Sequence, residues 1–151
     1  ALPGRGFPRI NDITTDTTNP PAFVALAQRP EQQGRDLNYP GESFASQQQS
    51  GYPDLEPLIV PAPPEEVFQR AQKAARHMPQ WQVIHADPVE RTIEGTATSR
   101  LFRFKDDFVI QVRPAPDGNG SAVHMRSKSR DGRGDIGANA ARIRAFFAKL
   151  S

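Results

Sequence analysis

Hydrophobic and polar residues follow a regular pattern from residue 57 onward. The apolar run 58–60 predicts a short strand, and apolar positions at helical spacing between 67 and 78 predict a helix. This helix begins at the proline pair 63–64, because proline is tolerated in the first turn, and it ends before Pro79. The pattern also predicts four further strands, at 81–86, 91–104, 108–114 and 121–129, and a second helix at 135–150.

The order of these elements is strand, helix, four strands, helix, which is typical of an α+β fold. It predicts two layers: an antiparallel sheet of about four to five strands, with both helices on one face. Turns are predicted at 87–88, 105–107 and 117–120. The strand at 91–104 is long and its apolar residues change face along it, so we expect a β-bulge near Ser99 or Arg100.

Residues 1–56 show no such pattern and are rich in proline and glutamine. Eleven of the fifteen prolines lie in residues 1–64. A long segment without regular structure is usually either disordered or functional. Scattered apolar residues favour an irregular arm that packs on the α+β domain of residues 57–151, so that the two form a single structural unit. These residues are Ile10, Ile13, Phe23, Val24, Leu26, Tyr39, Phe44 and Tyr52.

Composition excludes several classes of function. The chain has 151 residues and no cysteine, which excludes disulfides, a disulfide-linked partner, zinc–thiolate sites and thiol catalysis. No stretch approaches the roughly 18 apolar residues of a membrane-spanning helix. The chain starts at Ala1 without a signal sequence. We expect a mature product that has lost a signal peptide or membrane anchor, or a simple chain boundary, and therefore a periplasmic or membrane-associated protein.

Charge is divided unevenly along the chain. The formal net charge is +2, but residues 1–56 contain four arginines and seven carboxylates, which leaves +5 for residues 57–151. Alternation along the strands directs the apolar residues toward the helices: Phe102, Phe104, Phe108, Ile110, Val112, Val123 and Met125. The opposite face then carries Arg103, Gln111, Arg113, His124, Arg126 and Lys128.

This basic face allows three interpretations. It is a solvated outer face, or it binds an anionic partner, or the acidic arm lies across it. The anionic partners considered are anionic lipid, an acidic or membrane protein, and nucleic acid. Nucleic acid is the least favoured of them, because the strand aromatics that would stack on bases are predicted to point inward.

The densest group of polar residues joins the last strand to the last helix, at 126–143. A helix N-terminus with nearby glycines favours an anion. The candidate anion-binding residues here and on the basic face are Arg103, Arg113, Arg126, Ser127, Lys128, Ser129, Arg130 and Arg133. The alternative is purely structural: Asp131 or Asp135 pairs with Arg130 or Arg142, and a set of cap and turn residues shapes the helix start. This set is Gly132, Gly134, Asp135, Gly137 and Asn139.

Catalytic and metal-binding motifs fail in detail. A calcium loop at 131–142 would need glycine at Ile136 and glutamate at Arg142. No nucleophile elbow, zinc-protease helix or phosphate loop occurs, so we predict no metal, no cofactor and no assigned catalytic residue. A hydrolase built around Ser127, Ser129 or His124 stays as an alternative.

Three segments together resemble a known family. They are residues 8–23, 106–113 and 126–143, and they are similar to the signatures of the domain of unknown function 1499 family. The resemblance implies a bacterial or plastid protein, often exported or attached to a membrane, with no established activity and no known catalytic residues. It also implies that the arm belongs to the domain, and we expect residues 11–18 to pack beside 127–139.

The sequence therefore favours a non-enzymatic accessory or binding protein of the cell envelope. It would use the basic surface, or a cavity between sheet and helices, to bind an anionic or amphipathic ligand or a membrane surface. One alternative is a structural subunit of a membrane protein complex, with the arm as its contact. The other is the Ser/His hydrolase.

Overall fold

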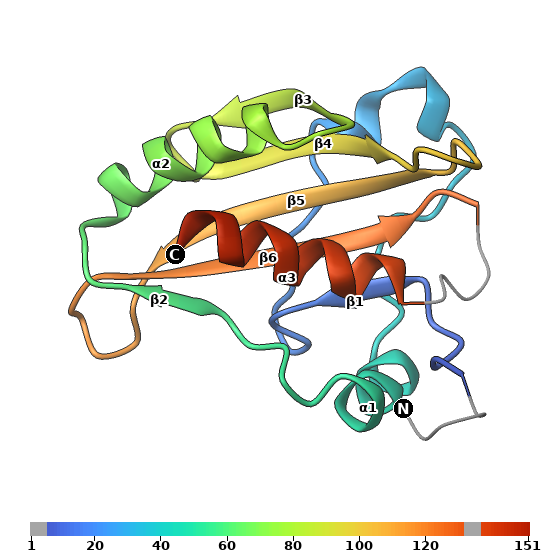
Figure 1. Cartoon of the computed structure of the whole chain (residues 1–151), viewed down its shortest axis with the longest axis horizontal. Helices are drawn as coiled ribbons and strands as arrows, with labels where there is room; N and C mark the ends of the chain where they lie inside the picture. Colours follow the sequence, from blue (N-terminus) through green and yellow to red (C-terminus); the bar gives the residue numbers. More distant parts are fainter. Residues whose placement is uncertain (1–5, 132–136) are drawn as a thin grey trace.

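The computed structural model describes residues 6–131 and 137–151 of the chain and shows an antiparallel sheet with helices packed on it (Figure 1). Within these residues lie the strands β1 (Asp12–Thr14), β2 (Leu58–Val60), β3 (Trp81–Asp87), β4 (Thr92–Thr98), β5 (Lys105–Pro114) and β6 (Ser121–Ser129). The helices are α1 (Glu42–Gly51), α2 (Pro64–His77) and α3 (Ala138–Leu150), with two short 3-10 turns, η1 (Leu26–Gln28) and η2 (Pro30–Gln32). None of the described helices is long and apolar enough to span a membrane.

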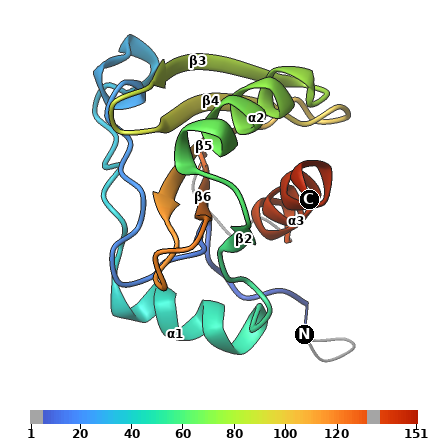
Figure 2. The ribbon, with the colours of Figure 1, turned by 90° about the vertical axis from the view of Figure 1, so that its left-hand side faces the viewer.

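The sheet runs β1-β6-β5-β4-β3, and all its pairs are antiparallel. Strand β2 also pairs with β6, beside β1 on the same edge. Helices α2 and α3 cover one face, whereas the N-terminal arm runs along the other (Figure 2). The predicted α+β class and antiparallel sheet are confirmed. The details differ, because the sheet has six strands and a third helix, α1, lies in the arm.

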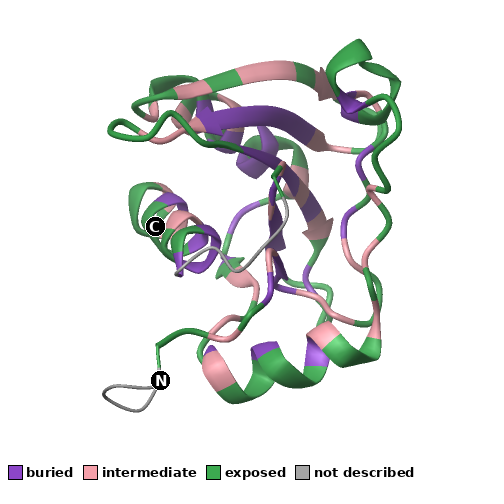
Figure 3. Cartoon of the chain, turned by 90° about the vertical axis from the view of Figure 1, so that its right-hand side faces the viewer, coloured by how far each residue is buried: buried purple, intermediate pink, exposed green. Residues whose placement is uncertain are grey.

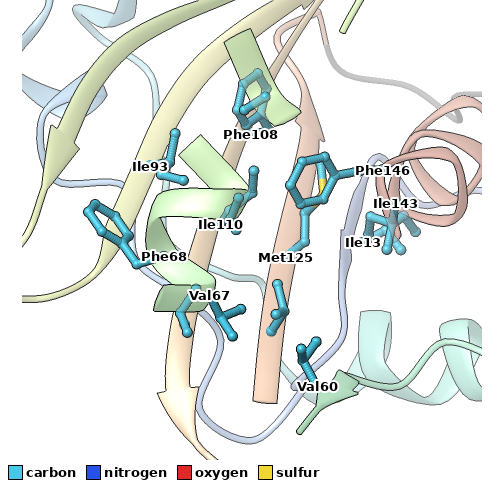
Figure 4. Close-up of a cluster of buried hydrophobic side chains, with 14 of the residues drawn as sticks. Ile13, Val60, Val67, Phe68, Ile93, Phe108, Ile110, Met125, Ile143 and Phe146 are labelled. Atoms are coloured by element: carbon cyan, nitrogen blue, oxygen red, sulfur yellow. The ribbon is translucent and has the colours of Figure 1, made fainter. Parts of the chain in front are cut away.

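The core lies between the sheet and helices α2 and α3 (Figure 4). Helix α2 begins with Pro64 in its first turn and turns Val67 and Phe68 inward. Trp81 packs on the Phe108 ring at 4.4 Å between centroids and on Phe146 at 5.5 Å. Buried side chains follow the sheet and the inner sides of these helices (Figure 3).

Glycine at position 95 is required by the packing of this core. A Cβ there would come within 2.5 Å of the Phe108 ring and 2.4 Å of the Gln82 carbonyl oxygen. Any larger residue would push β3 and β5 away from β4. The absence of a side chain at Gly95 therefore allows β3, β4, β5 and the Phe108 ring to pack closely together.

The arm is more regular than predicted. It supplies strand β1, helix α1 and the two 3-10 turns, and Ile10, Ile13 and Tyr52 join the main core. Strand β1 pairs with β6 in the register Asp12↔Lys128. The expected packing beside 127–139 is thus confirmed for residues 11–14, which lie along 126–129, whereas Thr15 bonds Met125 and Asp16 bonds Arg113.

The side chain of Gln48 closes the outer edge of β1. Its amide accepts a hydrogen bond from the Thr14 N–H at 3.0 Å and donates one to the Thr14 carbonyl at 2.7 Å. A glutamine on α1 thereby takes the place of a neighbouring strand. The backbone N–H and carbonyl of Thr14 on the outer edge of this short strand are therefore paired.

The predicted strand at 91–104 is wrong in its second half. Strand β4 ends at Thr98, and residues 99–104 form a loop before β5. The change of apolar face therefore marks a loop, whereas the bulge lies in β3 between Val83 and His85. Phe102 and Phe104 do not face the core: their side chains are 68% and 60% exposed.

The predicted turn at 105–107 is also wrong, because these residues begin β5. Asp106 and Asp107 are both buried in the sheet. Each finds an arginine there, Arg142 for Asp106 and Arg130 for Asp107. Adjacent aspartates usually indicate a turn, but two cationic partners from elsewhere in the chain allow a strand.

Candidate functional site

The basic face of the sheet is largely an internal surface. Arg126 donates two hydrogen bonds to the Asp12 carboxylate, at 2.9 and 2.8 Å, and the two side chains are 2% and 0% exposed. It also donates to the carbonyls of Pro21 and Leu37. Its guanidinium lies 4.6 Å from the Phe23 ring centroid. The arm therefore lies across this face and satisfies Arg126, which is the third of the three interpretations above.

Arg113 is engaged by the same arm. It bonds the Asp16 carboxylate at 2.7 Å and the Asn19 carbonyl at 2.8 Å. Partial burial raises the pKa of Asp16, but hydrogen bonds from the Asn19 N–H, Arg113 and the Thr18 N–H lower it overall. Arg113 therefore already has an ion-pair partner in the arm, the Asp16 carboxylate.

Arg130 belongs to a third pair. It bonds Asp107 at 2.8 Å, and the same carboxylate accepts hydrogen bonds from Gln32 at 2.7 Å and Thr96 at 3.0 Å. The hydrogen bond to Asp107 raises the pKa of Arg130. Arg130 therefore lies on the arm side of the sheet, away from the start of α3.

A buried carboxylate on the sheet, which the sequence analysis missed, holds the arm in place. Glu94 on β4 is 2% exposed and accepts hydrogen bonds from the backbone N–H groups of Val24, Ala25 and Leu26, at 2.8 to 3.0 Å. A carboxylate thus occupies the N-terminus of η1, where free N–H groups gather. The available signal was a single glutamate within the otherwise uncharged strand 92–98.

His124 is a neutral, buried side chain. The Thr15 hydroxyl accepts a hydrogen bond from the Met125 N–H and shares a second one with His124 Nδ1 at 3.0 Å. Burial, and then the nearby charge of Arg113, lowers the pKa of His124 to about 4, although Asp16 raises it. The imidazole is therefore neutral at pH 7.

Ser127 and Ser129 lie on the helix face, on the other side of the sheet from His124. Ser127 donates to Asn139 Oδ1 at 2.6 Å, and the Asn139 amide donates to Ser129 at 2.9 Å. Arg142 completes this network by bonding Asp106 at 2.7 Å and Ser127 at 3.1 Å. The network attaches the first turn of α3 to β5 and β6, with Gly137 at a φ of 80° as the residue before the helix.

The structure therefore divides the predicted anion site instead of assembling it. Arg113, Arg126 and Arg130 are neutralised under the arm, and Ser127 and Ser129 hold α3. Lys128 pairs in register with Asp12 on β1. The remaining candidate, Arg133, and the predicted cap and turn residues Gly132, Gly134 and Asp135 lie outside the described residues.

Among the predicted site residues that the structure describes, Arg103 is the one placed in an exposed loop. This β4–β5 loop, residues 99–104, lies at one end of the sheet, and Figure 3 shows its exposure. Leu101, Phe102 and Phe104 are 80%, 68% and 60% exposed, and the two phenyl rings stack at 5.6 Å. The exposed cations Arg100, Arg103 and Lys105 alternate with them.

The loop has a defined backbone. The Ser99 N–H donates to the Phe104 carbonyl, and the Phe104 N–H donates to the Ser99 hydroxyl, both at 2.8 Å. Arg103 adopts a φ of 59°, in the left-handed region that non-glycine residues seldom occupy. Three exposed apolar side chains are therefore held together by an ordered turn, which makes this loop the candidate functional site.

Two surface pockets border the arm. One of about 380 Å³ is formed by residues that include Phe23, Leu37 and Tyr39, with Arg126 beneath, and one of about 320 Å³ lies between Thr17, Gln48 and Tyr52. The space between the sheet and α2 and α3 is occupied by the apolar core. Among residues 6–131 and 137–151, no three His, Asp or Glu side chains gather in a way that could hold a metal ion.

The fold and the loop define an α+β protein whose arm completes the sheet. The chain belongs to the family described as "Protein of unknown function (DUF1499)", which matches residues 12–150. This family match confirms the resemblance noted in the sequence. No curated protein matches the chain.

Two solved structures are similar to part of the chain. The di-domain ARO/CYC BexL from the BE-7585A biosynthetic pathway is 18% identical, with a TM-score of 0.43 over 63% of this chain and 43% of BexL. Ara h 8.0201 is 13% identical, with a TM-score of 0.40 over 63% of this chain and 91% of its own. The chain thus spans less than half the length of BexL.

Proposed function

We propose that this protein is a non-enzymatic accessory protein of the cell envelope that binds an anionic membrane surface through its β4–β5 loop. The observation that carries the proposal is that, in the part of the chain that the structure describes, cations without a carboxylate partner and three exposed apolar side chains gather in this one loop. Arg113, Arg126, Arg130 and Arg142 each face a carboxylate. In contrast, Arg100 and Arg103 have no carboxylate partner among the described residues.

Charge complementarity supports an anionic surface as the partner. Residues 99–105 contain three cations and no acidic residue. Each Lys or Arg near an anionic leaflet contributes about 1 kcal/mol to binding, and the contribution falls off within a Debye length. A single loop of this kind gives weak, reversible and salt-sensitive association, which fits an accessory protein.

A second candidate function is a structural subunit of a membrane protein complex. The exposed Leu101, Phe102 and Phe104 favour it, because contiguous exposed apolar residues also mark protein interfaces. The hydrolase alternative has no comparable support. Ser127 is bound to Asn139 on the opposite face from His124, and His124 is bound to Thr15.

Co-sedimentation with vesicles tests the proposal. We expect binding to vesicles of phosphatidylcholine and phosphatidylglycerol in equal parts, loss of binding to pure phosphatidylcholine, and weaker binding as salt is added. The variant Arg100→Glu/Arg103→Glu should bind at least tenfold more weakly. The matched control is Lys73→Glu/Arg76→Glu, which reverses two exposed cations on α2 and should leave binding unchanged. Equal binding by both variants, or no binding by the wild type, would contradict the proposal.

A further inference from the structure

Positive charge alone does not account for the exposed apolar side chains of the β4–β5 loop. An electrostatic surface needs only cations, yet Leu101, Phe102 and Phe104 expose most of their area to water. Exposed apolar residues scattered singly are ordinary, but three within four positions are not. Their exposure favours a partner that removes them from water.

We propose that Leu101, Phe102 and Phe104 insert into the boundary between the headgroups and the acyl chains of an anionic bilayer. This inference rests on the proposed function and adds a mode of attachment to it. The loop acts as a short anchor: its apolar side chains enter the bilayer and its cations remain at the phosphates.

The backbone of the loop supports insertion as a unit. Two hydrogen bonds between Ser99 and Phe104 close its base, and the rings of Phe102 and Phe104 stack on each other. The left-handed conformation of Arg103 places a turn between the two aromatic residues. Little conformational entropy is therefore lost on binding, because the rings are already arranged together.

The alternation of cations with apolar residues points to lipid as the occupant. Interfacial segments combine bulky apolar residues with Lys and Arg, whose long side chains reach the headgroup phosphates while their stems stay in apolar surroundings. Here Arg100, Arg103 and Lys105 flank or separate all three apolar residues. This charge pattern complements a phosphate layer that overlies hydrocarbon.

Site-specific fluorescence tests insertion directly. The chain has no cysteine, so Leu101→Cys provides one site for an environment-sensitive nitrobenzoxadiazole label. The matched control is Val89→Cys in the turn between β3 and β4, at the other end of β4, because Val89 is also 80% exposed. With vesicles of phosphatidylcholine and phosphatidylglycerol in equal parts, we expect a blue shift at position 101 and quenching by lipids that carry a nitroxide on the acyl chain. Position 89 should show neither.

A second measurement uses unlabelled variants. Leu101→Ser/Phe102→Ser/Phe104→Ser should weaken vesicle binding by more than tenfold, whereas Val89→Ser should not change it. The triple variant should keep the wild-type melting temperature, since the three side chains are exposed, and this separates loss of binding from loss of folding.

The outcomes distinguish the inference from the proposed function. Salt-dependent vesicle binding with an unshifted label at position 101, or with full binding by the triple serine variant, would overturn insertion and leave surface binding standing. No binding to vesicles at all would overturn both. A blue shift with membranes that retain their proteins, but not with pure lipid vesicles, would also overturn insertion and would indicate a protein partner.

Discussion

Asp12 on β1 and Arg126 on β6 form an ion pair with two hydrogen bonds, although 114 residues separate them in the chain. Burial raises the pKa of Asp12, although the hydrogen bond from Arg126 and the charges of Arg126 and Lys128 lower it. The pair joins the arm to the last strand of the sheet. It converts the most basic strand of the molecule into an interior element.

Removal of one partner should destabilise the fold strongly. Asp12→Ala leaves the guanidinium of Arg126 buried without its carboxylate, which typically costs about 3–5 kcal/mol. Urea denaturation should show this loss in the free energy of unfolding. The control is Asp54→Ala, which breaks the exposed pair with Arg144 and should cost less than about 1 kcal/mol. Similar losses for the two variants would contradict an internal role for the arm.

Deletion of residues 1–22 should unfold the protein or lower its melting temperature sharply. The deletion removes β1, takes the fully buried Ile10 and Ile13 from the core and leaves Arg126 unpaired. Circular dichroism recorded during heating would measure the melting temperature.

A point variant tests the same role without truncation. Ile13→Ala alone should cost about 2–5 kcal/mol. Val24→Ala, at a position 66% exposed, should stay within about 0.5 kcal/mol of the wild type. An unchanged melting curve for the truncated chain would show that the arm is dispensable.

Glu94 gives a local test of how the arm is held. Both carboxylate oxygens accept backbone N–H groups at the start of η1. Glu94→Gln replaces one acceptor with an amide that donates, which leaves a buried N–H group without a partner and should cost about 1–3 kcal/mol. Hydrogen exchange at residues 24–26 should accelerate, while Glu90→Gln at an exposed position should change neither quantity. Unaltered exchange in Glu94→Gln would argue that these contacts contribute little.

Local patterns were sufficient for the regular part of the fold. The 3.6-residue spacing predicts α2, and alternation correctly assigns Ile110 and Met125 to the helix face and Arg113 and Arg126 to the other. Alternation depends only on neighbouring residues in one strand. The assignment of a strand residue to one face of the sheet therefore holds whatever packs against that face.

The arm could not be predicted in the same way. The three residues of β1 have no strand pattern of their own, and their pairing depends on β6 and on Gln48. The sequence assigns Asp106 and Asp107 to a turn, because it does not show the two arginines that reach them in the fold. The candidate site could not be singled out for the same reason. Arg103 stands out as the exposed cation of the predicted basic face only when the partners of Arg113 and Arg126 are known.

The buried imidazole of His124 predicts a pH dependence of stability. The folded state holds the pKa of His124 at about 4, against an ordinary value of 6.5. As pH falls below 6.5, the unfolded chain takes up a proton that the folded chain refuses, so stability declines until the pH reaches the folded-state pKa. The decline from this group is at most roughly 3 kcal/mol.

His124→Asn keeps a side chain that can hydrogen-bond the Thr15 hydroxyl but cannot be protonated, so its urea midpoint should fall less steeply between these pH values than that of the wild type. His85→Asn, on an exposed side chain, should keep the wild-type slope. Carboxylates such as Asp16 are present in both the wild type and His124→Asn, so the difference between the slopes of these two proteins isolates His124. Identical slopes would show that proton uptake by His124 is not linked to folding.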